Sequence, residues 1–363
     1  MSIEMVKLIY DQNTVLPQDD KFFQRALQDI EEDGISSQVF FLLKQQGRLT
    51  ETPSFFQQRL KECYDKGLFQ NLLIKNQTDA ILKSFEGKGI DVIALKGVYF
   101  AERYFGHIGA RATSDIDLLI QFQELDKAIE IIKSLGFSVE EEMIHGHFHC
   151  SFSKKLPGST MPLVVELHWN IVKENTSQFD INDLWGLAER FCNYQHIMEL
   201  SPTHLFYMIC LHGWRHNLDS MKYFLDIIQL IHTLGKENDY DDLLKLAASH
   251  KTLRRLKRTL SIVYNQFPHL SIVKRLPFEV KTTRWEYRRV KGLKQYVDFI
   301  DYQFLSYDTF KHSIIELHYW FWPSKYDLEA QIGVEQQGDP LFKMYLSLYK
   351  KRINSMVKVF LPH

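Results

Sequence analysis

The sequence predicts an α+β fold in three parts: a helical N-terminal segment, a core built on a mixed β-sheet flanked by helices, and a helical C-terminal domain. Three observations support this class. Apolar residues recur at three- and four-residue steps up to residue 89, short apolar or alternating runs follow, and helical spacing returns after residue 200. We therefore expect a helical region over 1–89, a core domain over 90–200 and a helical domain over 201–363.

Helical spacing in the N-terminal region is clearest in the segments VFFLLKQQGRL, FFQQRLKECYDKGLF and LLIKNQTDAILKSFEGKG. Gly87 and Gly89 in the last segment predict where the helix stops, because glycine commonly ends helices. The short apolar run IDVIAL (90–95) then predicts a buried strand. Lys96-Gly97 after it predicts a turn that leads into the helix VYFAERYF.

The rest of the core alternates strands with one helix. SDIDLLI (114–120) begins with polar and apolar residues in alternation and then turns apolar, as a strand with one partly wet face does. ELDKAIEIIKSLGF has helical spacing, FSVEEE and HGHFHCSFSK predict two strands, and PLVVELHWNI predicts another. Ser201-Pro202 then has the form of a helix start, followed by the helical segments HLFYMICLHGWRH, MKYFLDIIQLIHTLG and DDLLKLAASH.

Composition narrows the class of protein. Of the 363 residues, 45% are hydrophobic and 25% charged, as in folded globular proteins, and a formal net charge of -1 gives no overall field for nucleic acid or membrane lipid. Charges interrupt every apolar stretch before it reaches the roughly 18 residues that a membrane span needs, and the first residues do not form a secretory leader. We therefore expect a cytoplasmic protein that is not inserted in a membrane. The sequence leaves the oligomeric state open.

Asp115 and Asp117, separated by one apolar residue, are the most informative residues for chemistry. Side chains two apart on a strand point to the same face, so both carboxylates can reach one cation, and Mg²⁺ prefers carboxylates, waters and substrate phosphates. A solvated strand face or a turn is the alternative for a bare pair of this kind. Two features favour the metal site: Lys96-Gly97 at a strand-to-helix turn, where phosphate binds, and Glu166 inside an apolar run, where an unpartnered carboxylate is costly.

Taken together, these segments resemble the nucleotidyltransferase superfamily related to DNA polymerase beta: an apolar strand, a glycine turn, a helix, a strand with two aspartates and a later acidic strand. The phrases LKGVYFAERYF, RATSDIDLLI, VVELHWNI and LHGWRH followed by YFLDIIQLI resemble the group known as uncharacterised nucleotidyltransferase, over about residues 70 to 235. The resemblance implies a nucleotidyltransferase-type mixed sheet and an NTP donor, with Mg²⁺ or Mn²⁺ as cofactor.

The resemblance also implies roles for single residues. Asp115 and Asp117 would be metal ligands, and Glu166 would be the third acid, able to help activate the acceptor hydroxyl. Lys96 would neutralise the triphosphate and Gly97 would allow its close approach. The chain departs from the superfamily twice, because Lys96-Gly97 stands where Gly-Ser or Gly-Gly is usual and Glu166 where Asp is frequent.

Three neighbouring residues are candidates for nucleotide binding. Arg111 either contacts phosphate or the carboxylates, or lies in a solvent-exposed loop. Ser114 either hydrogen-bonds a ligand or only begins the strand. His168 shares a strand face with Glu166, so it either orients that carboxylate and the nucleotide or packs in the core.

Two sets of histidines have regular spacing. His145, His147 and His149 would share one strand face, which favours an edge strand or a substrate-facing wall over zinc, because no Cys or His pair elsewhere completes a ligand set. His212 and His216 lie four residues apart on a predicted helix and therefore on one helix face. A structural role is the favoured interpretation for this second set.

The segment from Lys251 to Lys294 is strongly basic. It contains 13 Lys or Arg and only Glu279 and Glu286 as acids, a local charge of +11 with Trp285 inside it. Such a segment binds a phosphorylated acceptor or a nucleic-acid backbone, or it is a solvated helical face balanced by the acidic remainder. The second interpretation is favoured.

Three functional hypotheses follow. The first is a metal-dependent nucleotidyltransferase that moves a nucleotidyl group from an NTP to a hydroxyl or phosphate on a small molecule or peptide, as in natural-product tailoring. The second is a catalytically impaired nucleotide-binding or partner-binding regulator of the same fold, motivated by the missing serine beside Lys96-Gly97. The third is an RNA-modifying nucleotidyltransferase that uses Lys251 to Lys294. The sequence leaves the donor base and the acceptor open.

Overall fold

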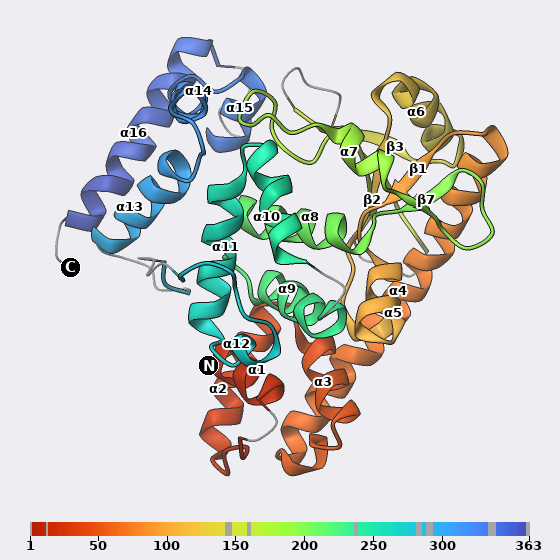
Figure 1. Ribbon diagram of the computed structural model, residues 1–363, viewed down its shortest axis with the longest axis vertical. Helices are drawn as coiled ribbons and strands as arrows, with labels where there is room; N and C mark the ends of the chain where they lie inside the picture. Colours follow the sequence, from red (N-terminus) through yellow and green to blue (C-terminus); the bar gives the residue numbers. More distant parts are fainter. Residues whose placement is uncertain are drawn as a thin grey trace.

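The computed structural model contains one seven-stranded sheet beside a larger helical body (Figure 1). This arrangement confirms the predicted α+β class and the mixed sheet. The structure describes residues 2–11, 14–141, 147–157, 161–235, 239–280, 285–287, 293–332 and 339–360.

The N-terminal helices are α1 (Ser2–Tyr10), α2 (Asp20–Glu32), α3 (Ser36–Gln45), the 3₁₀ helix η1 (Leu49–Glu51) and α4 (Ser54–Lys88). α4 is one helix of 35 residues, so the last two N-terminal segments predicted from the sequence belong to a single element. Gly89 ends it with a φ of +67°, a left-handed conformation that glycine adopts without steric cost. Gly87, which was also predicted to stop the helix, lies inside it.

The strands are β1 (Val92–Ala94), β2 (Asp115–Ile120), β3 (Ser138–Glu141), β4 (His149–Lys154), β5 (Leu163–His168), β6 (Glu189–Arg190) and β7 (Ile197–Glu199). Their order in the sheet is β3-β4-β5-β2-β1-β7-β6. β2 runs parallel to β5 and β1 parallel to β7, while the other neighbours are antiparallel. The first five strands match the predicted runs. β6 and β7 were not predicted, because two or three residues are too few to show an alternation.

The connections between the strands contain α5 (Val98–Phe105), η2 (Ile108–Ala110), η3 (Phe122–Glu124), α6 (Leu125–Ser134) and α7 (Ile181–Gly186). The second half of α4 and the apolar side of α6 cover one face of the sheet. Ile81 and Phe85 of α4, Ile132 of α6 and Leu118 of β2 belong to the same buried apolar cluster. The opposite face of the sheet is therefore the one that can hold polar side chains.

The C-terminal part is helical and comprises α8 (Pro202–Arg215), α9 (Met221–Leu234), α10 (Tyr240–Ser249), α11 (Leu253–Gln266), α12 (Leu270–Val273), α13 (Leu293–Ile300), the π-helix η4 (Asp301–Leu305), α14 (Phe310–Phe321), α15 (Lys325–Ile332) and α16 (Leu341–Phe360). The predicted start of α8 is confirmed, since the Ser201 side chain accepts from the backbone N–H of His204 and Pro202 is the first helical residue. In Figure 1, α8 to α11 lie between the sheet and the group formed by α13, α14 and α16. None of the described helices combines the length and apolar character needed to cross a bilayer.

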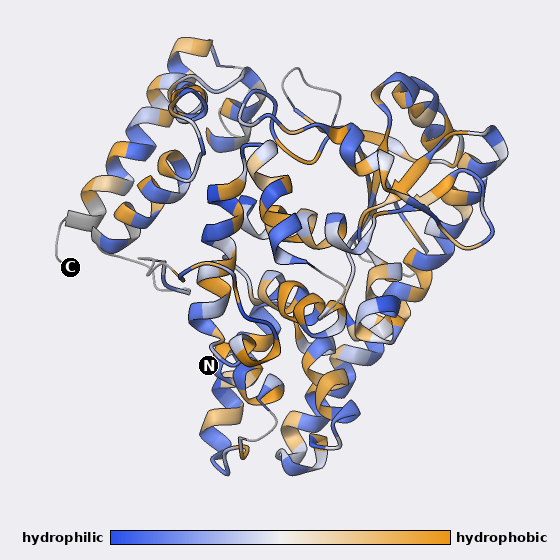
Figure 2. Ribbon diagram, in the orientation of Figure 1, coloured by the Kyte–Doolittle hydropathy of each residue, from blue (hydrophilic) through white to orange (hydrophobic). Residues whose placement is uncertain are grey.

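The N-terminal and C-terminal helices share one hydrophobic core. Met5 of α1, Phe23 of α2, Phe224 of α9 and Leu256 of α11 are fully buried in a single apolar cluster. Figure 2 shows hydrophobic and hydrophilic residues side by side along these helices, as expected of helices that bury one face. The division of the chain at residues 89 and 200 stays a prediction.

Candidate active site

Alternation along the strands separates apolar from polar side chains of the sheet. Ile116 and Leu118 of β2 and Val165 of β5 are buried in the apolar cluster beneath α4 and α6. Asp117 and Glu166 therefore point to the opposite face, and the parallel register of β2 and β5 pairs them directly. This register confirms that the strand of Glu166 neighbours the strand of the two aspartates.

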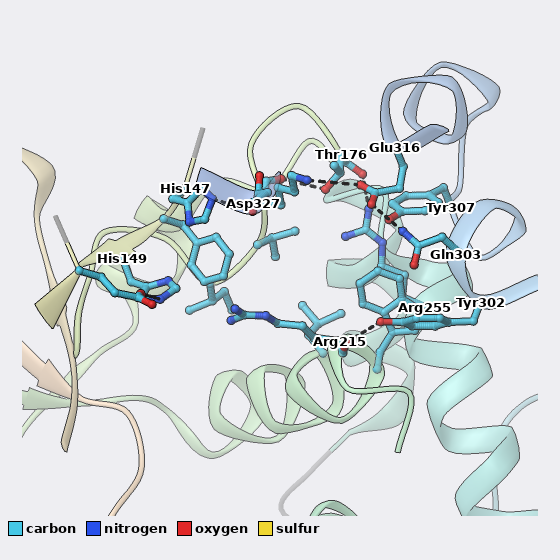
Figure 3. Close-up of a pocket in the computed structure, with 17 residues that line it drawn as sticks. His147, His149, Thr176, Arg215, Arg255, Tyr302, Gln303, Tyr307, Glu316 and Asp327 are labelled. Atoms are coloured by element: carbon cyan, nitrogen blue, oxygen red, sulfur yellow. Dashed lines mark hydrogen bonds and ion pairs between the residues drawn. The ribbon is translucent and has the colours of Figure 1, made fainter. Parts of the chain in front are cut away.

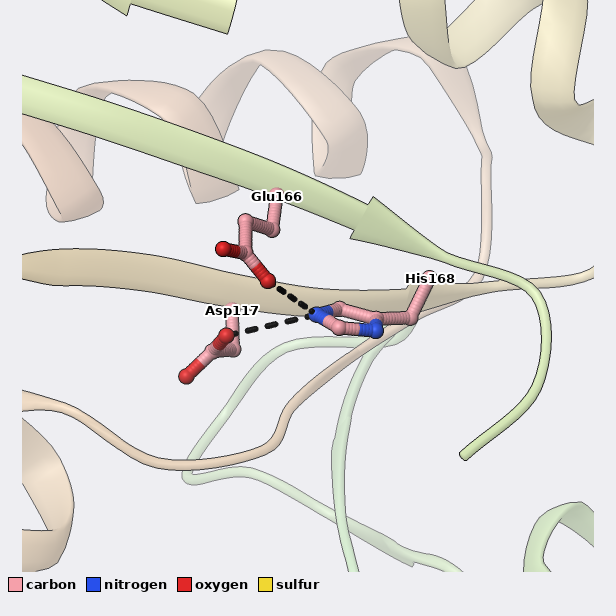
Figure 4. Close-up of side chains that lie close together, drawn as sticks. All are labelled: Asp117, Glu166 and His168. Carbon is pink, nitrogen blue, oxygen red and sulfur yellow. Dashed lines mark hydrogen bonds and ion pairs between the residues drawn. The ribbon is translucent and has the colours of Figure 1, made fainter. Parts of the chain in front are cut away.

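The carboxylates of Asp117 and Glu166 converge on the imidazole of His168 (Figure 4). Nε2 of His168 is 3.2 Å from Oδ1 of Asp117 and 3.0 Å from Oε2 of Glu166. One ligand atom from each of the three residues lies within 4.8 Å of the other two. Two carboxylates suit a hard divalent cation such as Mg²⁺, and an imidazole nitrogen extends the choice toward first-row transition metals. This donor set fits a divalent metal ion.

Lys96 approaches Asp117 from the β1 side. Its Nζ is 3.0 Å from Oδ2 of Asp117 and 3.2 Å from Nε2 of His212 on α8. Burial alone would raise the pKa of Asp117, but the charge of Lys96 and the hydrogen bond from His168 hold that pKa well below its usual range. For His168, burial disfavours the imidazolium, yet the hydrogen bonds it donates to Asp117 and Glu166 raise its pKa. Lys96 and His168 thus balance the charge of the buried carboxylates.

Asp115 lies at the start of β2, on the same strand face as Asp117 but only half-buried. Its Oδ1 accepts a hydrogen bond of 3.2 Å from Oγ of the exposed Ser114. The three residues within ligating distance of one another are Asp117, Glu166 and His168, so the structure brings His168 into the cluster where the sequence suggested Asp115. The roles of Asp115 as a metal ligand and of Ser114 and His168 in nucleotide binding stay predictions.

Gly97 joins β1 to α5 and stands directly before the first helical residue. Its φ of +90° and ψ of -145° form a backbone conformation that is essentially restricted to glycine. A Cβ built here would meet only ordinary contacts of 3.8 Å, with the carbonyl oxygen of Asp115 and Cγ2 of Thr113. The backbone conformation, rather than lack of space, therefore requires glycine. The turn places Lys96 beside a helix N-terminus, which is suited to phosphate.

Arg111 is engaged inside the protein. Its Nε and one terminal nitrogen donate to the two carboxylate oxygens of Asp226 on α9 at 2.7 and 2.8 Å. Arg111 is 4% exposed and Asp226 2%. The interpretation of Arg111 as a solvent-exposed loop residue is therefore wrong. Its burial is tolerated because Asp226 supplies a carboxylate partner. Its proposed contact with nucleotide stays a prediction.

Lys222 on α9 is a candidate that the sequence did not indicate. The positive charge of Arg111 and burial lower the pKa of Lys222 to about 8, while Asp226 and Asp115 act in the opposite direction. No hydrogen bond or ion pair engages its ammonium group within the described part of the chain. A lysine so placed near Asp115 can bind phosphate. No local pattern in the sequence indicates this role, because α9 is far from Asp115 in the chain.

The histidines predicted to share a strand face are partly described. His145 lies outside the described residues. His149 pairs with His168 across β4 and β5, with ring centroids 5.2 Å apart, and Nε2 of His147 is 3.4 Å from Oδ1 of Asp327 on α15. His147 and His149 both line a cavity, which supports the substrate-facing wall. Within the described residues, neither belongs to a group of metal-ligating side chains.

His212 and His216 lie on one face of the α8 segment, with ring centroids 4.9 Å apart. The ring of Tyr223 stacks on His216 at 4.8 Å. Burial lowers the pKa of His212 well below its usual range and that of His216 to about 4, so both are neutral near pH 7. Neutral His212 accepts the hydrogen bond from Lys96, which links this helix face directly to the carboxylate cluster.

In the described parts of the segment from Lys251 to Lys294, most basic side chains contact other groups of the protein. Contacts within the fold engage Arg254, Arg255, Lys257, Arg258 and Lys274. Arg258, for example, donates to a carboxylate oxygen of Asp298 at 2.6 Å. Positions 281–284 and 288–292 lie outside the described residues. Arg258 thus pairs with an acid as expected, but Arg255 and Arg258 are buried, so the expectation of a solvated helical face is wrong for these two residues. The RNA hypothesis gains no support from these contacts.

Comparison with known proteins identifies the family. The family described as uncharacterised nucleotidyltransferase matches residues 20–268. No curated protein matches the sequence. Among solved structures, the solution structure of the antibiotic-resistance factor ANT(2'')-Ia is similar at 15% identity and a TM-score of 0.33, covering 50% of this chain and 91% of that one. A crystal structure of ANT(2")-Ia in complex with adenylyl-2"-tobramycin has 16% identity, a TM-score of 0.32, and coverage of 50% and 96%.

Proposed function

The chain belongs to the nucleotidyltransferase family that matches residues 20–268, and we propose that it is a divalent-metal-dependent enzyme of this kind. It moves a nucleotidyl group from an NTP to a hydroxyl or phosphate on a small molecule or peptide. The observation that carries the proposal is the pairing of Asp117 with Glu166 on one polar sheet face, with His168 within hydrogen-bonding distance of both and Lys96 on the other side of Asp117.

We propose Asp115, Asp117 and Glu166 as metal ligands. Nε2 of His168 would join them only where a metal ion displaces the proton that it donates to the two carboxylates. The convergence of Asp117, Glu166 and His168, with ligand atoms within 4.8 Å of one another, supports this role, because two neighbouring carboxylates suit a hard divalent cation. A bound Mg²⁺ or Mn²⁺ would neutralise the donor phosphates and polarise the phosphoryl group that is transferred.

The protein's own groups would bind and orient the two substrates. Lys96, Lys222 and the N-terminus of α5 after Gly97 neutralise the β- and γ-phosphates of the donor. The acceptor oxygen forms a bond to the α-phosphorus while the bond from that phosphorus to the bridging oxygen breaks, and pyrophosphate leaves. Glu166 lies on the side of Asp117 away from Lys96 and holds the proton that the acceptor hydroxyl loses.

Thermal stabilisation by nucleotides tests the proposal without knowledge of the acceptor, because ligand binding to the folded state raises the apparent stability. The melting temperature is measured with each NTP, with and without Mg²⁺, for the wild type and for Asp115→Asn/Asp117→Asn. We expect a metal-dependent increase for at least one NTP that is lost in the double variant. A well-folded wild type that responds to none of the NTPs would overturn the proposal.

A second candidate is a nucleotide-binding regulator without catalysis. Lys96 and His168 already balance the charge of Asp117, and the serine usual at the phosphate turn is replaced by Lys96-Gly97. This candidate predicts that an NTP stabilises Asp117→Asn as well as the wild type. The transferase predicts instead that the substitution abolishes the metal-dependent part of the stabilisation.

A further inference from the structure

A cavity of about 400 Å³ lies between the β4 side of the sheet and the C-terminal helices (Figure 3). His149 lies at one end, Tyr307 and Glu316 lie at the other, and Arg215 of α8 lies between them. This volume is within the range of small-molecule sites. The cavity adjoins the carboxylate cluster, because His149 is the direct β-sheet neighbour of His168.

The order of the strands decides which substrate the cavity can receive. Lys96 follows β1, Asp117 is on β2, Glu166 is on β5 and His149 is on β4, and these four strands are consecutive neighbours in the sheet. The carboxylates of Asp117 and Glu166 therefore lie between Lys96, at the proposed phosphate-binding turn, and His149, at the cavity. In an in-line displacement the attacking oxygen and the leaving group lie on opposite sides of the phosphorus. With pyrophosphate leaving near Lys96, the acceptor enters from the cavity.

Each carboxylate of the cavity contacts a neighbouring side chain. Oε2 of Glu141 lies 3.8 Å from Nε2 of His149, and Oδ1 of Asp327 lies 3.4 Å from Nε2 of His147. Glu316 accepts a hydrogen bond of 2.7 Å from Gln303 and lies 3.9 Å from Nζ of Lys173. Arg215 differs, because in the described residues no carboxylate lies within ion-pair distance of its guanidinium. That guanidinium lies over the ring of Phe148, 4.6 Å from its centroid. One strong cationic donor in the wall is therefore open to an anion.

Arg255 of α11 is a second arginine of this kind, and it is deeply buried at 1% exposed. Its guanidinium carbon lies 4.7 Å from the ring centroid of Trp214 and 4.4 Å from that of Tyr307. One terminal nitrogen donates to the carbonyl oxygen of Thr176, but Nε has no hydrogen-bond partner among the described residues. Burying a cation without a carboxylate is costly, so an anion in the cavity would be stabilising.

We propose that this cavity is the acceptor site and that it takes a hydroxyl-bearing small molecule with an anionic group, a phosphate or a carboxylate, bound by Arg215 with Arg255 behind it. The inference rests on the proposed transferase function, which supplies the reaction and the direction of attack. Aromatic rings from Phe148, Tyr302 and Tyr307 line the same cavity and cover the body of the acceptor. Guanidinium groups suit both anions, because their planar donors match carboxylate and phosphate oxygens.

The test uses probes that share a hydroxyl-bearing body and differ in charge. Glycerol 3-phosphate, glycerate and glycerol form one matched set, and 4-hydroxyphenylacetate and its amide form another with an aromatic body. Binding to the full-length protein is measured by calorimetry in the presence of Mg²⁺ and the NTP that stabilises it. The proteins are the wild type, Arg215→Gln, Arg215→Lys, Lys96→Met and Arg103→Gln, an exposed arginine paired with Glu199 that serves as control.

We expect the anionic members to bind the wild type and the Arg103→Gln control at least about tenfold more tightly than their neutral partners, as one charge-assisted contact allows. Arg215→Gln should remove this preference and Arg215→Lys should keep part of it, while the NTP still raises the melting temperature of both. The phosphate and carboxylate probes then show which anion is preferred.

Three results would overturn the inference: equal binding of charged and neutral members, anion binding that survives Arg215→Gln, or anion binding that is lost only in Lys96→Met, which would place the anion on the donor side. Each leaves the transferase proposal standing if the NTP still stabilises the wild type. A wild type that responds to no NTP would instead remove the transferase proposal itself.

Discussion

The two sides of Asp117 differ in how their positive charges are balanced. On the β1 side, Lys96 lies 3.0 Å from Asp117, and Arg111 donates two hydrogen bonds to a buried aspartate. On the cavity side, Arg215 and Arg255 lie against aromatic rings, and no described carboxylate is within ion-pair distance of either. The fold supplies carboxylate partners for Lys96 and Arg111, whereas an anionic ligand would stabilise the charges of Arg215 and Arg255. Substitutions on the two sides should therefore affect stability and binding differently.

Asp117→Asn should have the largest effect, because it removes the carboxylate that Lys96 and His168 both contact. With an acceptor in hand, we expect the rate of pyrophosphate release to fall by about 10²–10³-fold or more, the usual loss when an electrostatic group of an active site is removed. Asp91→Asn, at a half-buried aspartate that pairs with His196 at 2.8 Å, is the matched control and should keep full activity. Unchanged release by a folded Asp117→Asn would exclude its catalytic role.

Arg111→Met tests the balanced side through stability. Removing one partner of a buried ion pair leaves the other charge unpaired, so we expect the free energy of unfolding to fall by about 3–5 kcal/mol. Urea denaturation followed by circular dichroism measures this change. The double variant Arg111→Met/Asp226→Leu should recover most of the loss, because neither charge is then buried alone. A loss below about 1 kcal/mol for the single variant would show that the pair is not structural.

Arg255→Met is the matching experiment on the cavity side. The substitution loses the hydrogen bond to the carbonyl oxygen of Thr176 and two cation–π contacts worth about 0.5–2 kcal/mol each, but it also removes a buried cation that has no carboxylate within ion-pair distance among the described residues. We expect the two effects nearly to cancel, with a change of about 1 kcal/mol in the same urea experiment. A destabilisation as large as that of Arg111→Met would contradict the difference between the two sides.

Lys222→Met probes a cation that no hydrogen bond or ion pair engages among the described residues, and its effect on the free protein should depend on pH. The charge of Arg111 and burial lower the pKa of Lys222 from 10.5 to about 8, so the unfolded state binds its proton more tightly than the folded state. Stability should therefore rise between about pH 8 and pH 10.5, and Lys222→Met should abolish that rise and raise the melting temperature at pH 7.

The same variant should weaken NTP binding by roughly tenfold if Lys222 contacts the donor phosphates, as loss of one charge-assisted contact does. Lys245→Met, at an exposed lysine paired with Asp242, is the control for both measurements. Unchanged NTP binding by Lys222→Met would remove this lysine from the donor site.

Local patterns in the sequence predicted how several of the candidate site residues lie in the sheet. The alternation in SDIDLLI and VVELHWNI predicted two strands with their acids on one face, and Asp117 and Glu166 are indeed paired in neighbouring strands. His168 was a candidate for the same reason, because it lies two residues after Glu166 on the same face. Gly89 was correctly predicted to end a helix, whereas Gly87 lies inside it, because a single glycine costs a helix only about 1 kcal/mol and does not force it to end.

The cationic residues around the cluster could not be predicted in this way. Arg215, Lys222 and Arg255 lie on three different helices of the C-terminal part, and helical spacing indicates only which side of each helix is apolar. Whether a basic residue at the edge of that side meets a carboxylate, an aromatic ring or solvent depends on how the helices pack. The bulk charge of the segment from Lys251 to Lys294 therefore suggested a surface, although Arg255 within it is almost completely buried.

By itself, the sequence determined the polar face of the sheet, its acids and the glycine turn beside them, because the two-residue period of a strand and the conformational freedom of glycine are local properties. Only the tertiary structure decided how the charges are shared: Arg111 pairs with Asp226, while Arg215 faces a cavity without a carboxylate partner among the described residues. These contacts join segments far apart in the chain, and they are set by the burial of apolar helix faces in a common core rather than by any local pattern.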